Sequence, residues 1–147
     1  MIEEELYQEI RMRLPIACVD LLIVYENRYL LLKRLHAPAK GQWWFPGGRI
    51  FKNETIAEAC RRKGRGELGL DLDAGDIVSV EESIFRDEDP IIHTINMVVK
   101  ASMGKDRQHI ILDDTHAEYC WLEMIAPGLH PCVSGPLMKA GFYLEES

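Results

Sequence analysis

The stretch Gly48–Leu70, GRIFKNETIAEACRRKGRGELGL, carries the pattern that decides the fold. Thr55 and Glu58 have the spacing of a capping box, which predicts that a helix begins at this point. An inward-facing stripe follows, with one member every four residues, at Ile56, Cys60, Gly64 and Leu68. The three glycines between residues 64 and 69 each weaken a helix by about 1 kcal/mol relative to alanine. We therefore expect the last turn of this helix to be loose or to end early.

The segments on both sides of this helix predict alternating strands and helices. Residues 3–13 have the apolar spacing of an amphipathic helix, which places an N-terminal helix within residues 1–14, and Pro15 ends it. The Glu26-Asn27 pair predicts a tight turn between two strands. Strands are expected over residues 16–25, 28–34, 77–85, 91–101 and 118–123, and a final helix over 136–145. This order indicates one α+β domain with a mixed sheet, spanning residues 1–147.

Composition and charge restrict the class of protein. The chain has 147 residues, enough for one domain, and its net charge of −7 opposes a broad electrostatic grip on nucleic acid. No run approaches the ~20 apolar residues of a membrane helix, and the first residues lack the features of a secretory signal. The four cysteines are scattered without a C-x-x-C pair, which favours reduced thiols. We expect a cytoplasmic protein without nucleic-acid or membrane partners.

The stretch Gly48–Leu70 resembles the Nudix box. The pattern of this box is G, five residues, E, seven residues and R-E-U-x-E-E-x-G-U, in which U is aliphatic. The matching residues are Gly48, Glu54, Arg62, Glu67, Gly69 and Leu70. The departures are Lys63, Gly64 and Gly66, where the pattern has Glu, an aliphatic residue and Glu. A full box gathers three carboxylates on one edge of the helix, whereas here Glu67 remains and Lys63 lies four residues before it. The sequence therefore favours one divalent ion over a multi-metal site.

Motifs around the box make the chain similar to GDP-mannose mannosyl hydrolases, a Nudix branch with the same shortened box. These motifs are Asp20, Lys33-Arg34, the loop Pro38–Trp43, Phe45–Arg49, Lys52-x-Glu54-Thr55, Glu67–Leu70 and His116-x-x-Tyr119-x-Trp121. The resemblance runs from about Tyr7 to Glu123. It implies the Nudix fold, an α/β/α sandwich in which a mixed central sheet lies between helices, with residues 48–70 as a modified box.

The resemblance also implies a reaction: water attacks the anomeric carbon of a nucleotide sugar, GDP-mannose or GDP-glucose, and GDP leaves. His116 is the candidate base, because histidine accepts protons near neutral pH. A diphosphate leaving group needs charge neutralisation more than a proton. One Mg²⁺ (or Mn²⁺) held by Glu67 and the Gly47 carbonyl is expected to supply it.

The remaining candidate residues are expected to contact the substrate. Arg34 and Arg62 are candidate catalytic cations on the diphosphate, and Arg49 is a further substrate-binding cation. Asp20 interrupts an apolar strand and needs a partner, such as a sugar hydroxyl or Arg34. Tyr7 matches a position at which the family stacks an aromatic ring on guanine, across the interface of an expected homodimer.

Several of these residues have structural alternatives. Glu54 is expected to brace the loop and helix rather than to bind metal. Arg62 has Glu54 or Glu58 as a partner in place of a phosphate, and Glu67 has Lys63 as an ordinary pair four residues away.

Two departures keep other functions open. The family has a glutamine ligand immediately before the catalytic histidine; here Thr115 follows Asp113-Asp114, so that water or one of the aspartates takes that place. A tyrosine and a histidine of the family's middle strands are replaced near Thr94 and Ser83. The alternatives are a phosphorus-directed pyrophosphohydrolase of ADP-ribose-like substrates or nucleotides, and a non-catalytic nucleotide-binding regulatory module with the Nudix fold.

Overall fold

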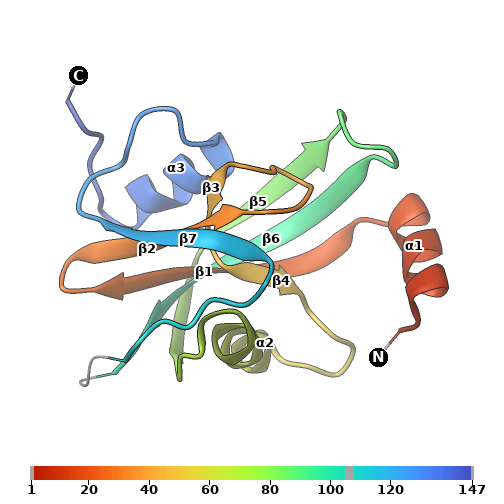
Figure 1. The fold of residues 1–147 in the computed structure, drawn as a ribbon, viewed down its shortest axis with the longest axis horizontal. Coiled ribbons are helices and arrows are strands. Elements are labelled where there is room, and N and C mark those ends of the chain that lie inside the picture. The colour runs from red at the N-terminus through yellow and green to blue at the C-terminus, as the bar shows by residue number, and fades with distance from the viewer. Residues whose placement is uncertain (1, 105–107, 147) are drawn as a thin grey trace.

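A mixed β-sheet between helices organises the chain in the computed structural model, which describes residues 2–104 and 108–146 (Figure 1). The elements in chain order are α1 (Glu4–Arg13), β1 (Ile16–Tyr25), β2 (Arg28–Arg34), β3 (Trp43–Trp44), β4 (Gly47–Arg49), α2 (Ile56–Lys63), the π-helical turn η1 (Gly64–Leu68), β5 (Asp73–Phe85), β6 (Ile92–Ser102), β7 (His116–Leu122) and α3 (Pro131–Lys139). In Figure 1, α2 and α3 lie on opposite sides of the sheet, and α1 lies beyond one end of it. The predicted α+β sandwich is confirmed.

The sheet joins its strands in the order β3-β2-β1-β6-β5, with β4 paired to β1 and β7 paired to β2. The β1–β6 pair is parallel, from Ile16 opposite Thr94 to Ile23 opposite Ala101. The other pairs are antiparallel. The central strand β1 therefore has a parallel neighbour, β6, and antiparallel neighbours, β2 and β4, which makes the sheet mixed.

Alternate residues of β1 face two separate cores, because side chains of a strand point to opposite faces in turn. Leu21 packs in the core that includes Cys60 of α2. Its neighbour Leu22 packs in the core that includes Leu137 of α3. Burial on both faces explains why this strand appears in the sequence as a nearly continuous apolar run.

Most elements have the expected positions. The bounds of β1 and β2 are those predicted, and the turn residues Glu26 and Asn27 have φ angles of +49° and +61°, as a tight hairpin requires. Thr55 caps α2, since its Oγ1 accepts a hydrogen bond from the Glu58 amide at 3.1 Å. The glycine-rich end of the helix forms the π-helical turn η1, which confirms the expected loosening.

Other boundaries differ from the prediction. The strands β5 and β7 begin earlier than expected, and the segment between β2 and α2 contains the short strands β3 and β4, which are additional to the strands expected from the sequence. The helix α1 forms as predicted but none of its residues is buried. Leu6 in the helix and Leu14 directly after it are 47% and 59% exposed. No helix among the described residues is long and apolar enough to cross a membrane.

The final helix was predicted at the wrong place. It spans Pro131–Lys139 rather than 136–145, and Pro136 lies inside it. Its cap is His130, whose Nδ1 accepts a hydrogen bond from the Cys132 amide at 3.0 Å. Proline at the first helical position is favourable because its missing N–H has no partner there, but histidine is not one of the usual cap signals. The chain leaves the helix at Gly141, which has a φ of +98°.

Candidate functional site

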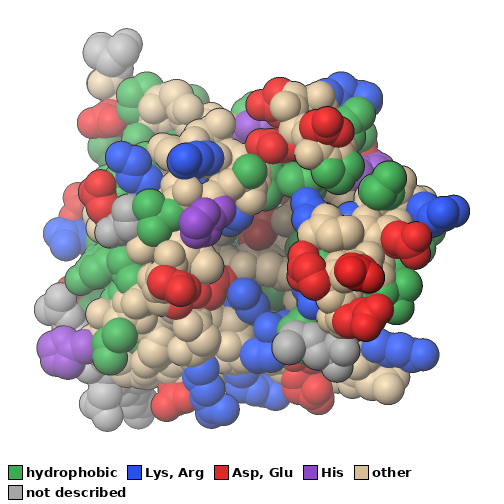
Figure 2. Space-filling model, turned by 45° about the vertical axis from the view of Figure 1, so that its right-hand side comes forward, with side chains coloured by type: hydrophobic (Ala, Val, Ile, Leu, Met, Phe, Trp, Pro, Cys, Tyr) green, Lys and Arg blue, Asp and Glu red, His purple; other side chains and the backbone are tan. Residues whose placement is uncertain are grey.

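A cavity of about 280 Å³ opens between α1, the loop after β2, β4 and the ends of β5 and β6. The molecule is hollowed on the side shown in Figure 2, and Lys and Arg side chains gather along the lower edge of the hollow. Five of the residues expected in the site line the cavity: Tyr7, Asp20, Arg34, Gly47 and Arg49. The fold thus brings together an N-terminal helix, two central strands and the loop that enters β4 at Gly47 and Gly48, here called the Gly-Gly loop.

Arg49 supplies a positively charged wall. Its Cζ lies 3.7 Å from the ring centroid of Tyr7 and 5.3 Å from that of Phe51, so the guanidinium is held against aromatic rings. Its Nη1 is buried and has no hydrogen-bond partner among the described residues. A buried donor without a partner is costly, and a negatively charged ligand would satisfy it. Arg34, nearby, donates from Nε to the Pro38 carbonyl at 2.6 Å.

Asp20 belongs to a chain of hydrogen bonds that joins β1 and β6 in the cavity lining. Asn96 Nδ2 donates to Asp20 Oδ2 at 3.1 Å, and Thr94 Oγ1 donates to Asn96 Oδ1 at 2.6 Å. The direct partner of Asp20 is therefore Asn96, where the sequence suggested a sugar hydroxyl or Arg34. Burial raises the pKa of Asp20 to about 7, against the opposing effects of the Asn96 hydrogen bond and the Arg34 charge.

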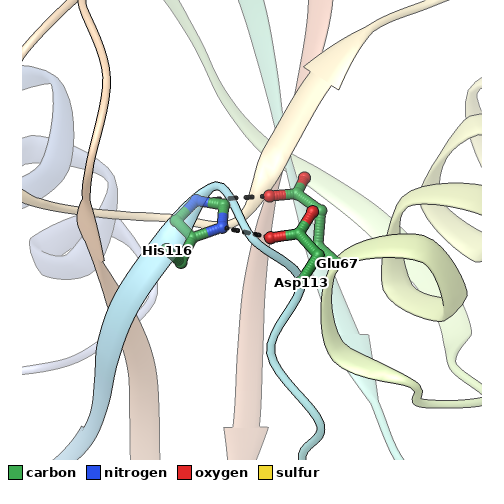
Figure 3. Close-up of side chains that lie close together, drawn as sticks. All are labelled: Glu67, Asp113 and His116. Carbon is green, nitrogen blue, oxygen red and sulfur yellow. Dashed lines mark hydrogen bonds and ion pairs between the residues drawn. The ribbon is translucent and has the colours of Figure 1, made fainter.

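Glu67, Asp113 and His116 meet in a second group of polar side chains (Figure 3). His116 Nε2 lies 3.3 Å from Glu67 Oε2, and His116 Nδ1 lies 3.1 Å from Asp113 Oδ1. One donor atom from each residue lies within 4.8 Å of the others. Two carboxylates and an imidazole are suitable ligands for a divalent ion. Asp113, one of the alternatives for the absent glutamine ligand, is the aspartate that reaches this cluster.

The carboxylate of Glu67 already has cationic and donor neighbours. Lys63 Nζ lies 3.2 Å from Oε1, so the pair four residues apart is formed, and the Gly47 amide donates to the same oxygen at 3.1 Å. Glu67 is only 4% exposed. Its burial raises the pKa, while the charges of Lys63 and His116 lower it. A divalent ion at this carboxylate therefore has to share it with an ammonium group.

Gly47 connects the cavity and the cluster, since it lines the cavity while its amide contacts Glu67. A side chain is excluded there, because a Cβ on Gly47 would lie 2.2 Å from the Val19 carbonyl oxygen. Of the described residues, those that line the cavity do not include Glu67 or His116. The expected site residues other than Arg62 thus fall into two neighbouring groups, one around the cavity and one behind the Gly-Gly loop.

Arg62 lies in neither group but braces the loop beneath Arg49. Its Nε and Nη2 form a bidentate pair with Glu54 at 2.7 and 3.0 Å, and Nη2 also donates to the Arg49 carbonyl at 2.9 Å. Glu54 accepts a further hydrogen bond from the Phe51 amide at 3.0 Å. The hydrogen bond from Arg62 lowers the pKa of Glu54. Glu54 thus makes the bracing contacts expected of it, and Arg62 pairs with Glu54, the structural alternative to a phosphate contact.

The sequence interpretation missed Asn96. It is buried in β6, a strand that also contains His93, Thr94, Lys100 and Ser102. Its polar side chain therefore does not stand out in the sequence as Asp20 does in the apolar strand β1. Its pairing with Asp20 depends on the parallel alignment of β1 and β6, which no local pattern specifies.

A mixed sheet, a loop–helix unit that presents a glutamate behind a Gly-Gly loop, and a basic cavity beside it together define a Nudix-type protein. The sequence model of the NUDIX domain matches residues 15–131, and the chain belongs to the Nudix hydrolase family.

Relatives and solved structures agree with this assignment. The chain is 31% identical over 134 residues to the low-salt glycan biosynthesis protein Agl8 of Haloferax volcanii, covering 90% of this chain and 86% of that protein. It is 37% identical over 84 residues to an ADP-ribose pyrophosphatase of Methanocaldococcus jannaschii, covering 57% of this chain and 48% of that protein. The crystal structure of a MutT Nudix hydrolase from Burkholderia pseudomallei is similar in fold, with a TM-score of 0.75, 24% identity and coverage of 86% and 98%.

Proposed function

We propose that this Nudix protein hydrolyses a nucleoside-diphosphate sugar, GDP-mannose or GDP-glucose, at the anomeric carbon, and releases the free sugar and GDP. The observation that carries the proposal is the basic cavity beside a box that keeps one carboxylate, Glu67, of the three that a full box gathers on the edge of its helix. Arg34 and Arg49 line the cavity, and Lys63 accompanies Glu67 where a full box would have another glutamate. The similarity to a glycan biosynthesis protein agrees with a sugar-containing substrate.

Attack on carbon needs fewer catalytic groups from this site than attack on phosphorus does. When the sugar–oxygen bond breaks, the diphosphate leaves as an anion and needs positive charge near its oxygens. Arg34 and Arg49 offer that charge from the cavity wall. Arg62 is proposed to act as a positioning residue, since it holds the Arg49 carbonyl. Tyr7 and Asp20 are proposed to contact the base and the sugar respectively.

His116 is proposed as the group that accepts the proton of the attacking water. Asp113 contacts Nδ1 and fixes the orientation of the ring, an arrangement that leaves Nε2 as the reactive nitrogen. Nε2 points at Glu67 behind the Gly-Gly loop. The proposal therefore requires that the sugar end of the substrate extend from the cavity past Gly47.

One Mg²⁺, or Mn²⁺ in its place, is the proposed cofactor. The donors that fit it are the carboxylates of Glu67 and Asp113, with the Gly47 carbonyl at the edge of the cavity. When bound, the ion neutralises charge on the leaving diphosphate.

A second candidate is attack on phosphorus in an ADP-ribose-like substrate, which the similarity to an ADP-ribose pyrophosphatase favours. Hydrolysis in H₂¹⁸O separates the two. GDP-mannose incubated with the protein and Mg²⁺ would give ¹⁸O in the sugar for attack on carbon and ¹⁸O in the phosphate for attack on phosphorus. Binding without turnover across nucleotide sugars and nucleotides would instead indicate a regulatory module and contradict the proposal.

We also propose that the protein is a cytoplasmic homodimer. Three apolar side chains of α1 and the residue after it are exposed and offer a surface for a second copy: Leu6, Met12 and Leu14. All four cysteines are free thiols, in keeping with a reducing compartment. Light scattering that gives the mass of one chain at every concentration would contradict the dimer.

A further inference from the structure

Lys63 stands at a box position where the Nudix pattern has a glutamate, and its ammonium group lies beside the carboxylate that the box retains. Nζ is 3.2 Å from Glu67 Oε1, and the side chain is 24% exposed. It packs against Gly48, where an added Cβ would come within 2.9 Å of Lys63 Cε and 3.0 Å of Nζ. A positive charge therefore lies between the box helix and the Gly-Gly loop that borders the cavity.

Both oxygens of Glu67 have partners in this arrangement. Oε1 faces Lys63 and the Gly47 amide, and Oε2 faces His116 Nε2. A divalent ion that approaches Glu67 meets a resident cation first, and two cations that share one carboxylate repel each other. The ammonium group has three hydrogens, and one contact to Oε1 leaves two for another acceptor.

We propose that Lys63 is a resident cation of the diphosphate site, which competes with a divalent ion for Glu67 and donates its remaining hydrogens to a diphosphate. The neighbouring Gly48 has no side chain to separate the ammonium group from a ligand at the loop. The inference rests on the proposed function in one respect, that the ligand carries a diphosphate. It has two consequences: diphosphate binding persists without a divalent ion, and Lys63 weakens metal binding.

Both consequences are measurable by binding alone. Calorimetry with inorganic pyrophosphate, in EDTA and in Mg²⁺, gives the first, and electron paramagnetic resonance of free Mn²⁺ gives the second. The variants are Lys63→Met, the charge-preserving Lys63→Arg, and Arg61→Met, which removes a charge from an exposed position of the same helix.

The unaltered protein should bind pyrophosphate measurably in EDTA, and more tightly in Mg²⁺ because the ion adds positive charge at the diphosphate. Lys63→Met should weaken binding in EDTA at least tenfold and tighten Mn²⁺ binding at least tenfold, while Lys63→Arg and Arg61→Met stay near the unaltered protein. If Lys63→Met does not fold, Lys63→Gln provides the same comparison.

Pyrophosphate binding that requires Mg²⁺ in the unaltered protein would overturn the inference, as would a Lys63→Met protein with both affinities unchanged. The proposed function fails separately. A protein that binds pyrophosphate as described but hydrolyses no nucleotide sugar would leave the role of Lys63 intact and remove the proposed reaction.

Discussion

The Nε2 atom of His116 lies 3.3 Å from Oε2 of Glu67, and both side chains are buried. The opposite ring nitrogen, Nδ1, contacts Asp113 at 3.1 Å, so the imidazole lies between two carboxylates. Nε2 can accept a proton or bind a metal ion only through its lone pair, and these two uses of the same lone pair exclude each other.

The replacement His116→Gln tests the first of these uses. If Nε2 accepts the proton of water, kcat for GDP-mannose should fall about 10²- to 10⁴-fold with little change in KM, because the loss affects the transition state rather than binding. Steady-state kinetics of the variant and of His36→Gln, at an exposed position, provide the measurement and its control. A kcat near that of the unaltered protein would remove His116 from the mechanism.

The stacking of Arg49 on Tyr7 gives a second prediction, since the guanidinium lies 3.7 Å from the ring centroid. Tyr7→Ala should raise KM for the nucleotide sugar about two- to fivefold, which corresponds to the ~0.5–1 kcal/mol of an exposed cation–π contact. Tyr7→Phe keeps the ring and should leave KM unchanged. Glu9→Gln, at an exposed position of α1, is the control. Equal KM values for Tyr7→Ala and the unaltered protein would show that the stack does not hold Arg49 for binding.

The buried carboxyl of Asp20 predicts how stability depends on pH. A carboxyl whose pKa rises on folding holds its proton in the folded state at pH values where the unfolded chain has lost it. The free energy of unfolding should therefore fall as the pH rises from about 4, the ordinary pKa of aspartate, to about 7, the raised value. Asp20→Asn removes this contribution.

Urea unfolding at pH 5 and pH 8 measures the effect. Between these pH values the midpoint of the unaltered protein should fall more than that of Asp20→Asn, whereas the exposed control Asp73→Asn should behave like the unaltered protein. Parallel midpoints for Asp20→Asn and the unaltered protein would contradict the raised pKa.

Local signals in the sequence specify much of the fold. The Glu26-Asn27 turn fixes the hairpin because both residues adopt positive φ, and the Thr55 hydroxyl starts the box helix through one hydrogen bond. Such signals act within a few residues. The start of the final helix was predicted wrongly because its cap is the His130 imidazole, whose role depends on a hydrogen bond that composition does not reveal.

The motif positions select candidate residues for the site, but they do not specify how these residues group in space. Motif positions identify Glu67 and His116, yet their contact depends on how the loop before β7 returns to η1, a long-range relationship. The same holds for the contact of Asp20 with Asn96, which follows from the alignment of β1 with β6. The sequence spacing also does not decide whether Arg62 contacts a ligand or braces the loop through Glu54. The structure shows the contact with Glu54.

The two glycines of η1 provide a matched pair for testing why this turn departs from the family pattern. An added Cβ at Gly64 would lie 2.5 Å from Leu72 Cδ1 in the core, whereas at Gly66 nothing lies within 4 Å. Gly64→Ala should therefore destabilise the fold by about 1–3 kcal/mol through overpacking. Gly66→Ala should be neutral or stabilise by up to about 1 kcal/mol, because alanine restricts the unfolded chain. Urea unfolding compares the two, and equal destabilisation would show that backbone freedom, not the close contact with Leu72, requires glycine in this turn.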